Sequence, residues 1–459
     1  MATDAPHRIG ATAVVLGASM AGLCAARVLA DRFERVIVLD RDDLPDSTDP
    51  RGQVPQGHHP HLLLVAGARI LESWFPGITT ELEAAGTTTI DLVGDFYWHQ
   101  AGGEMRRPKS DLRGPVMSRP LLERAVRRRV ESLANVTVRG STEVNGVHLD
   151  ARRQRVTGVH LADGTTVSCE LVIDATGRRA RTLPWLQTLG YEPPEMSTVT
   201  VDTRYVTRCY RRTDQPTRDW QAAAIIDDPS TRRLAMALPI EGERWIVMFG
   251  GLNGEKPPVD ELDRVTYARS LPSRVIADIL EAEEPVGEVA THRFPANQRR
   301  HVEKLRRFPL GWAPLGDSIC SFDPIYGQGM TSAAMQAETL GRCLDRTGAV
   351  DRRFARRYFK HVAKVVAVPW SIAVGGDFAY PGTVGKKPAG TDLLNRYMDR
   401  INIAAQHDDL VAVRFNEVAA LVRRPESLLA PRFYLRVRRA AKRGPARTGL
   451  AESSTPAFE

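Results

Sequence analysis

The N-terminal stretch of the chain alternates short apolar runs with a helical pattern of apolar positions. Val14–Leu16 is an apolar run, and a glycine-containing segment, Gly17–Gly22, follows at once. Small and apolar side chains then recur at helical spacing, and a second apolar run, Val36–Leu39, ends at Asp40. Two buried strands joined by a helix predict a parallel βαβ unit. We therefore expect an α/β fold.

The turn at Gly17 has the spacing of a dinucleotide-binding fingerprint, with one departure. Gly17 permits a tight turn, Gly22 lets helix and strand approach closely, and Ser19 stands where the fingerprint has its middle glycine. The helix N-terminus offers unpaired N–H groups to a pyrophosphate, and Asp40 is placed to accept a hydrogen bond from a ribose hydroxyl. Because such corners also occur in folds that bind no nucleotide, this stretch alone leaves both interpretations open.

Patterns further along the chain indicate how it is divided. Leu171–Asp174 is a third apolar run, expected to end at the same sheet edge as the first turn. Residues 195–295 show patterns typical of antiparallel strands, followed by a return to the first domain. We expect a nucleotide-binding domain in 1–194, an inserted β-sheet domain in 195–295, a return segment in 296–347, a helical region in 348–443 and a disordered tail in 444–459.

Capping residues and apolar patterns predict several helices and strands within these regions. Ser118 can cap a helix over Leu121–Ala134. Thr87–Trp98 reads as an extended segment, and Val259–Ala282 as a helical one.

Composition and charge narrow the class of protein. The net charge is +8, with a pI of about 9.4, but no nucleic-acid motif accompanies the basic residues, so solvated helix faces are favoured over nucleic-acid binding. The best apolar stretch, Lys364–Gly376, is shorter than a membrane span and contains Pro369, so no stable membrane insertion is expected. The lack of a signal segment and the five scattered cysteines favour a cytoplasmic protein without a zinc site.

Three histidines, His58, His59 and His61, lie close together in a loop. Their spacing does not match a helix-borne metal pair, and no acidic residue is placed nearby. We expect no metal site here, and favour a loop that closes over a bound ligand.

Three glycine-containing segments together resemble the FAD motifs of the class A flavoprotein monooxygenases, the family of para-hydroxybenzoate hydroxylase. GASMAG from Gly17 resembles the pyrophosphate turn, and DATGRRAR from Asp174 resembles the motif between the two domains. GWAPLGDSICSFDPIYGQGM from Gly311 resembles the motif whose Asp holds the ribityl chain. The resemblance implies a Rossmann-like FAD-binding domain of the glutathione-reductase type, with an inserted antiparallel β substrate domain and C-terminal helices. At Asp174 the chain departs from the family, because Asp-Ala-Thr-Gly replaces an adjacent Asp-Gly.

The resemblance also implies which residues surround a non-covalently bound FAD. Asp40 would hold the adenosine ribose, Arg119 the phosphates or ribityl chain, and Asp317 the ribityl chain. The turn Pro324–Met330 would lie beside the isoalloxazine, where a helix N-terminus stabilises reduced flavin. The expected cofactor-binding residues are Gly17, Ser19, Met20, Ala21, Gly22, Asp40, Arg41, Arg119, Val144, Asp174, Gly177, Gly316, Asp317, Pro324, Gly327, Gln328, Gly329 and Met330.

A narrower resemblance covers Pro50–His61, PRGQVPQGHHPH, which is similar to the flavin epoxidases of polyether ionophore biosynthesis. It implies that Arg51, Gln56, His58 and His61 lie near the flavin or line its entrance. Arg51, His58 and His61 are thus the candidate catalytic residues, with simple loop anchoring as the alternative.

The family's chemistry belongs to the cofactor. The resemblance implies that NADH or NADPH reduces the flavin, and that O2 then gives a C4a-hydroperoxide which transfers one oxygen atom. Epoxidation of an alkene needs a dry pocket but no protein base, whereas phenol hydroxylation benefits from one. None of His99, Tyr205 and His292 stands out as a base. This favours epoxidation in a hydrophobic polyketide or terpenoid.

Apolar residues of the inserted sheet are expected to face either this small hydrophobic substrate or the core. They are Met236, Leu238, Met248 and Phe249, and the candidates for a C-terminal cap are Trp370, Phe378 and Tyr380. Aromatic hydroxylation, a flavin reductase like geranylgeranyl reductase, and a non-catalytic nucleotide-binding protein remain alternatives. A halogenase is disfavoured because no W-x-W-x-I-P motif occurs. A separate flavin reductase is a candidate partner.

Overall fold

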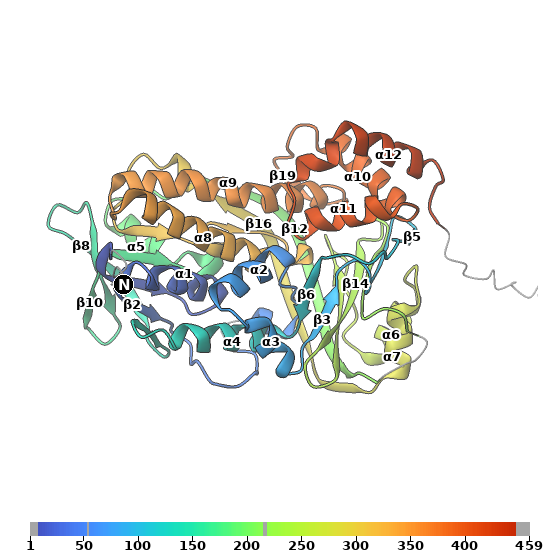
Figure 1. Ribbon diagram of the computed structural model, residues 1–459, viewed down its shortest axis with the longest axis horizontal. Coiled ribbons are helices and arrows are strands. Elements are labelled where there is room, and N and C mark those ends of the chain that lie inside the picture. Colours follow the sequence, from blue (N-terminus) through green and yellow to red (C-terminus); the bar gives the residue numbers. More distant parts are fainter. Residues whose placement is uncertain (1–7, 53–54, 214–217, 447–459) are drawn as a thin grey trace, which may run out of the picture.

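The computed structural model describes residues 8–52, 55–213 and 218–446, and it has two lobes (Figure 1). The first lobe is built on a parallel sheet in the order β17-β11-β1-β2-β7. Its strands are β1 (Gly10–Leu16), β2 (Phe33–Leu39), β7 (Val136–Arg139), β11 (Leu171–Asp174) and β17 (Trp312–Pro314). The parallel pairing of β1 with both β2 and β11 confirms the predicted βαβ unit and places the third apolar run beside it.

Helices from distant parts of the chain cover this sheet. The helix α1 (Met20–Ala30) packs against α8 (Gly329–Thr347), which in turn packs against α9 (Arg352–Asp377). Figure 1 shows α8 and α9 side by side along the first lobe. The other helices of this part are α2 (Val65–Trp74), α3 (Ile78–Ala84), α4 (Arg119–Glu131) and α5 (Thr182–Thr188). Two small sheets accompany them: β8 (Val144–Leu149), β9 (Val156–Leu161) and β10 (Thr166–Ser168), and β3 (Thr88–Asp91) with β6 (Arg113–Val116).

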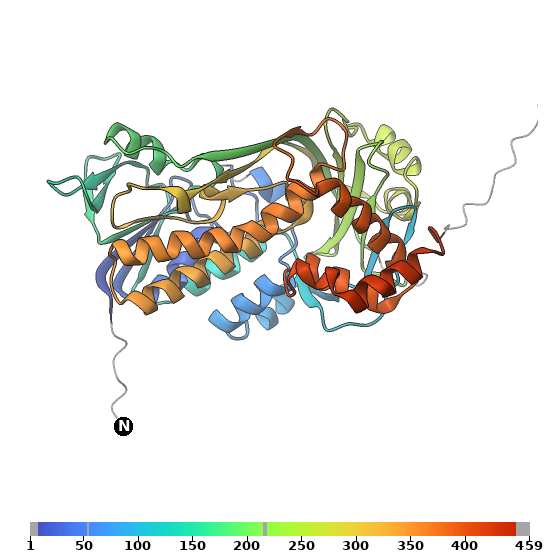
Figure 2. The same ribbon diagram turned by 90° about the horizontal axis from the view of Figure 1, so that it is seen from above.

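The second lobe is built on a larger sheet in the order β18-β16-β12-β15-β14-β13-β4-β5, with β19 on β12. Figure 2 shows the long strand β12 running from the first lobe into the second. The sheet is not confined to residues 195–295, because β4 and β5 come from the first region and β18 and β19 from later ones. The strands are β4 (Phe96–Gln100), β5 (Gly103–Glu104), β12 (Met196–Arg211), β13 (Ala222–Ile226), β14 (Arg233–Ile240), β15 (Arg244–Gly251), β16 (Pro285–Arg300), β18 (Cys320–Ser321) and β19 (Val384–Gly385).

The two faces of this sheet have different neighbours. The helices α6 (Glu261–Arg269) and α7 (Val275–Ala282) cover the face to which Trp245 and Phe249 belong. Three C-terminal helices lie at the end of the lobe (Figure 1). They are α10 (Thr391–Ala405), α11 (Asp409–Ala419) and α12 (Pro431–Ala441).

Two expected elements are broken by local chemistry. The helical stretch Val259–Ala282 is two helices, because Pro272 in the link lacks an N–H and disfavours helical geometry in the residue before it. The extended stretch Thr87–Trp98 is two strands, and the Asp91 carboxylate closes the intervening turn by accepting from Val93 N at 2.9 Å. Ser118 caps α4 as predicted, accepting from Leu121 N.

No described helix is long and apolar enough to cross a membrane. The helix α9 contains Lys364–Gly376 and has Pro369 in its interior. Most of the expected disordered tail, from residue 447 on, lies outside the described residues.

The corner between β1 and α1 tolerates no side chain at Gly22. A Cβ there would lie 1.8 Å from the Gly17 carbonyl oxygen, whereas a Cβ at Gly375, a glycine inside α9, would meet nothing within 4 Å. We predict that Gly22→Ala lowers the thermal midpoint sharply or prevents soluble expression. Gly375→Ala is expected to be neutral or to stabilise by up to about 1 kcal/mol, because alanine favours helices. Thermal unfolding measures both, and equal midpoints would contradict the packing described here.

Candidate active site

A cavity of about 610 Å³ runs along the carboxyl edge of the parallel sheet. It is bordered by the turns that follow β1 and β11, by the end of β2, and by the N-terminus of α8. The strand ends of a parallel sheet meet at such an edge, which is where ligands bind in open α/β sheets. The predicted cofactor residues that line it are Gly17, Ser19, Met20, Ala21, Asp40, Arg41, Arg119, Val144, Gly177, Gly316, Asp317, Pro324, Gly327, Gly329 and Met330.

The first turn leaves the N-terminus of α1 free for an anion. Gly17 has a φ of 103°, and a Cβ there would lie 2.6 Å from the Ala175 carbonyl oxygen. Ser19 is the N-cap residue, but its hydroxyl does not cap the helix and instead donates to Glu123 Oε1 at 2.5 Å. Within the described chain, the first N–H groups of α1 thus have no side-chain cap and suit a phosphate group.

Asp40 directly follows β2 at the same edge of the sheet. Its carboxylate stabilises the neighbouring backbone turns and also lines the cavity. Its carboxylate accepts from Ala18 N at 2.6 Å and from Asp42 N at 2.8 Å. Arg51 Nη1 lies 3.7 Å from the same carboxylate. This position fits the predicted contact with a ribose hydroxyl.

A buried ion network connects α1, α4 and the loop before η1 (Pro55–His58). Arg119 donates to Glu123 at 2.9 Å and to Ser19 Oγ at 2.9 Å, and Arg51 donates to the other Glu123 oxygen at 3.1 Å. Burial raises the pKa of Glu123, but Arg119, Arg51 and the Ser19 hydroxyl outweigh it and hold the pKa at about 2. Glu123 is therefore ionised. Its role was missed from the sequence, although Arg119 and Glu123 have the spacing of a helical ion pair.

Asp317 has the properties of a ligand residue rather than a structural one. It lines the cavity, and no described residue donates a hydrogen bond to its carboxylate. Burial raises its pKa, against the opposing effect of Arg119, Arg178 and Arg300. A hydroxyl-rich chain such as ribityl would supply the missing donors.

Three of the predicted cofactor residues do not line this cavity. Asp174 is fully buried, and its carboxylate accepts hydrogen bonds from Thr176 N and Oγ1 and from Ser318 Oγ, the last at 3.1 Å, so it braces the turn. Gly22 acts through helix–strand packing, and the side chain of Gln328 is buried at the start of α8.

The start of α8 directs its positive end toward the cavity. Gly327 has a φ of 64°, a conformation that favours glycine, and the N-cap Gln328 makes no side-chain cap. A Cβ at Gly329 would meet nothing within 4 Å, so the backbone is open to a ligand. A helix N-terminus here suits the electron-rich edge of a flavin.

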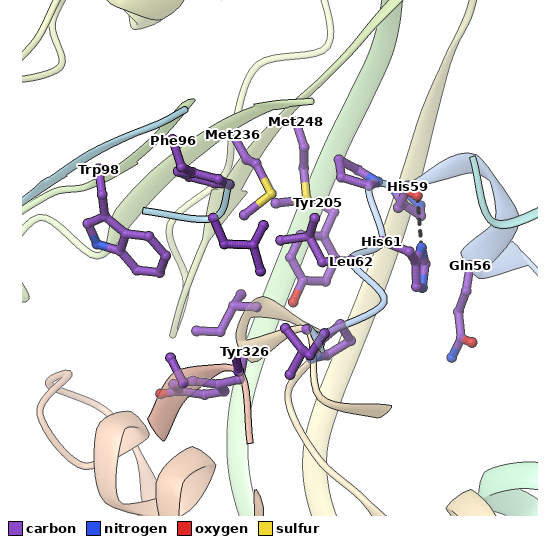
Figure 3. A pocket seen from close by; sticks show the side chains of 18 of the residues that line it. Gln56, His59, His61, Leu62, Phe96, Trp98, Tyr205, Met236, Met248 and Tyr326 are labelled. Atoms are coloured by element: carbon purple, nitrogen blue, oxygen red, sulfur yellow. Dashed lines mark hydrogen bonds between the residues drawn. The ribbon is translucent and has the colours of Figure 1, made fainter. Parts of the chain in front are cut away.

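A second cavity, of about 100 Å³, lies between the larger sheet and the C-terminal helices (Figure 3). Its wall is mainly apolar, with contributions from η1, the strands of the larger sheet and α11. Figure 3 shows Phe96, Trp98, Met236 and Met248 on the sheet side of this cavity. Both cavities are lined by Gln56, His61, His292, Pro324 and Gly327. They therefore meet at the turn that precedes α8.

The four predicted substrate residues lie on β14 and β15, and only two of them line the second cavity. Met236 and Met248 pair across β14 and β15 and line the second cavity. Phe249, the next residue, faces α6 and α7 and contacts Tyr267, so its placement at the substrate is wrong. Leu238 is buried on the Met236 side but lies outside the cavity lining, where it packs in the core.

Of the candidate bases and the candidate cap residues, only some line the second cavity. Tyr205 and His292 line the second cavity, whereas His99 is buried elsewhere in the sheet. Trp370, Phe378 and Tyr380 belong to the apolar cluster that contains Tyr205, but they do not line the cavity. The cap comes instead from Asn416, Ala419 and Ala420 at the end of α11, which sequence reasoning missed.

The three loop histidines do not converge. His58 is exposed and lines neither cavity, so it is not a catalytic candidate. His59 and His61 are part of the cavity wall, and Figure 3 shows the hydrogen bond between His61 Nδ1 and the His59 carbonyl oxygen, 2.9 Å long. His61 Nε2 lies 3.3 Å from Arg119 Nη1, and Arg51 lies in the ion network. Arg51 and His61 are thus placed at the cofactor cavity.

These features fit an FAD molecule without covalent attachment. The cavity is bordered by two helix N-termini without side-chain caps, and Asp40 and Asp317 in its lining can accept hydrogen bonds from hydroxyl groups. Gly17 and Gly316 keep its wall free of side chains, since a Cβ at Gly316 would lie 2.7 Å from that of Ala21. The buried Arg51 Nη1 has no hydrogen-bond acceptor in the described chain, and phosphate oxygens would provide one.

We predict that Asp317→Asn separates cofactor binding from stability. Because the folded-state pKa of Asp317 lies above its unfolded value, its stabilising effect is lost as the pH rises, and the ionised group weakens the FAD-free fold near pH 7. The substitution should therefore raise the thermal midpoint of the FAD-free protein and reduce FAD content, measured as the ratio of flavin to protein absorbance. Full FAD occupancy, or a lower FAD-free midpoint, would contradict this role.

Acid is expected to unfold the FAD-free protein partly through His59. Burial lowers its pKa to about 3, with His292, His61 and His58 adding to the effect. Between that value and the unfolded value of 6.5 only the unfolded chain binds the proton, so stability falls as the pH drops. In His59→Gln the slope of unfolding free energy against pH should decrease by about 1.4 kcal/mol per pH unit between about pH 6 and 4. Denaturant titrations at a series of pH values measure it, and an unchanged slope would disprove the assignment.

Comparisons with known proteins agree with the fold and with the expected family. Residues 11–348 match the family model described as "FAD binding domain". The chain is 34% identical over 423 residues to Protein Rv3254 of Mycobacterium tuberculosis, covering 88% of each protein. Among solved structures it is similar to PqsL, a probable FAD-dependent monooxygenase from Pseudomonas aeruginosa, with a TM-score of 0.59, 18% identity and coverage of 81% of this chain and 99% of that one. It is also similar to the flavin-dependent brominase Bmp2, with a TM-score of 0.65, 14% identity and coverage of 95% and 98%. The chain belongs to the FAD-binding-domain family of class A flavoprotein monooxygenases.

Proposed function

We propose that the protein is an FAD-dependent monooxygenase that epoxidises an alkene in a hydrophobic polyketide or terpenoid. The observation that carries the proposal is the meeting of an apolar cavity with the cofactor cavity at Pro324–Gly327. A substrate held in the apolar cavity would lie against the turn that borders the isoalloxazine end of the cofactor site. Such positioning and exclusion of water are what the protein must supply.

Bound flavin, once reduced, would activate O2, which would supply the transferred oxygen atom. The chain's own residues do the rest. The N-terminus of α8 would stabilise negative charge on the edge of a bound flavin. Apolar side chains such as Leu62, Phe96 and Met248 exclude water from the substrate side. NADH or NADPH as electron donor, and a separate flavin reductase, are part of the proposal.

The histidines at the cavity favour an alkene over a phenol. Burial holds the pKa of His59 and of His61 at about 3 and also lowers the pKa of His292. Imidazoles with such low pKa values are poor bases for removing a phenol proton. The Tyr205 hydroxyl donates its proton in a hydrogen bond to Asp323 at 2.7 Å, so it is not available as a base either. Aromatic hydroxylation is therefore the second candidate, and reduction of a double bond by the bound flavin is the third.

The reaction type is tested by product mass under labelled O2. We predict that the FAD-loaded protein, given NADH or NADPH and a panel of terpenoid and polyene alkenes, adds one labelled oxygen atom and leaves an epoxide. Addition of two hydrogen atoms would identify a reductase, and oxygenation of phenols alone would identify an aromatic hydroxylase. A protein that takes up no FAD would contradict all three candidate functions.

Neighbouring residues of β15 provide a matched pair of variants. Met248→Trp should fill the apolar cavity and lower kcat/KM by about 10-fold or more with unchanged FAD content. Phe249→Leu, on the opposite face, should lower stability by about 1–2 kcal/mol but leave the product unchanged. Equal effects of the two substitutions on turnover would show that oxygenation takes place elsewhere.

A further inference from the structure

Most polar side chains around the apolar cavity are already committed to protein partners. Tyr205 donates to Asp323 Oδ1 at 2.7 Å, and Tyr326 donates to Asp377 Oδ1 at 2.9 Å. Trp98 Nε1 donates to Gln100 at 3.0 Å. Both ring nitrogens of His61 have partners, the His59 carbonyl oxygen and Arg119. These groups shape the cavity but have little capacity left for a ligand.

Two histidines at the end next to the cofactor cavity differ from this pattern. His59 is 6% exposed, its Nδ1 lies 2.8 Å from Thr207 Oγ1, and its buried Nε2 has no partner in the described chain. The His292 ring lies 5.6 Å from the His59 ring, and neither of its nitrogens is hydrogen-bonded to a described residue. A buried polar atom without a partner is costly, so a ligand that satisfies it gains affinity.

The position of the pair ties it to the reacting end of a substrate. His292 lines both cavities, and its ring is stacked on Tyr205 with an interplanar angle of 8° and a centroid distance of 6.4 Å. Strand β16 carries His292 and strand β12 carries Tyr205, where the two residues pair directly. The ring is therefore fixed on the sheet, beside the place where the cavities meet.

The pair presents no charge to a ligand. Burial keeps both imidazoles neutral, because it lowers the pKa of each. Arg119, whose Nη1 lies 3.3 Å from His61 Nε2, is already engaged by Glu123, Ser19 and Gln56. A carboxylate at this place would lose its hydration without gaining an ion pair.

We propose that His59 and His292 form a subsite that hydrogen-bonds a neutral oxygen group of the substrate, a hydroxyl or carbonyl, next to the carbon that is oxygenated. The inference rests on the oxygenase function proposed above. It narrows the substrate class to unsaturated alcohols, aldehydes or ketones with an apolar remainder. When Thr207 donates to Nδ1, the Nε2–H of His59 can donate to a carbonyl, and in the other tautomer Nε2 accepts from a hydroxyl. Hydrocarbons and carboxylic acids of the same skeleton are excluded from tight binding.

Binding to the oxidised FAD-loaded protein tests the subsite without turnover. The probes are geraniol, geranial, geranic acid and the hydrocarbon of the same skeleton, each titrated while the change in flavin absorbance is followed. We expect geraniol or geranial to bind about tenfold more tightly than the hydrocarbon and the acid, which corresponds to one satisfied hydrogen bond. Which of the two binds better reports the tautomer of His59.

Variants separate a hydrogen-bonding role from a structural one. His59→Leu and His292→Leu should reduce the affinity for geraniol and geranial to that for the hydrocarbon, while hydrocarbon affinity and FAD content stay the same. His59→Gln restores an amide to the same place and should recover part of the preference. Leu62→Ala, which changes the apolar wall instead, should weaken all four probes together.

Several results would contradict the proposed subsite. The affinities of the four probes could follow their apolar area alone, geranic acid could bind most tightly, or no probe could bind. The leucine variants could also keep the preference for geraniol or geranial. Because neither O2 nor a reductant is present, failure here is distinct from failure of the oxygenase function. Selective binding without oxygenation would contradict the function and leave the subsite, whereas oxygenation without selectivity would do the reverse.

Discussion

Two buried carboxylates hold the turn on which both cavities depend. Asp323 accepts from the Tyr205 hydroxyl and from Ile325 N, and Asp377, at the end of α9, accepts from the Tyr326 hydroxyl at 2.9 Å and from Asn297 Nδ2 at 2.6 Å. The Asn297 side chain joins the two, because its oxygen accepts from Asp323 N at 2.7 Å. The turn before α8 is thus fastened to the larger sheet on one side and to α9 on the other.

This arrangement has an energetic cost that the surrounding donors offset. Burial raises the pKa of both carboxyl groups, and the neighbouring Asp323 raises that of Asp377 further. Removing a donor such as Tyr326 would leave a buried acceptor unpaired, which costs more than the hydrogen bond itself contributes. The same hydroxyl-bearing rings, Tyr205 and Tyr326, form part of the wall of the apolar cavity. Cavity shape and turn position are therefore set by one network.

The parts of the site predicted from sequence are those governed by local backbone geometry. Gly17 takes a left-handed conformation beside a tight contact, and the spacing of its turn along the chain was enough to find it. Gly316 takes a similar conformation, but it and Asp317 were identified through the resemblance to the family's motif. The hydrogen-bond partners of Asp174 and the face of the sheet on which Phe249 lies were not predicted, because both depend on tertiary packing. Asp174 has nearby hydroxyl donors that no motif reveals, and Phe249 lies on a strand that is apolar on both faces, so alternation did not indicate which face meets the substrate.

The acidic residues of the cofactor cavity explain how an arginine-rich site is kept in order before an anion binds. Glu123 holds Arg51 and Arg119 together, and Asp40 and Asp42 lie within 3.7 and 3.8 Å of Arg51. The cations are thus pre-positioned, so binding phosphate requires little reorganisation. Asp317 is the exception, because nearby arginines offset only part of the rise in its pKa caused by burial, and no described residue donates a hydrogen bond to it. A group that weakens the fold alone and gains partners only from a ligand is the pattern expected where function, not stability, determines the residue.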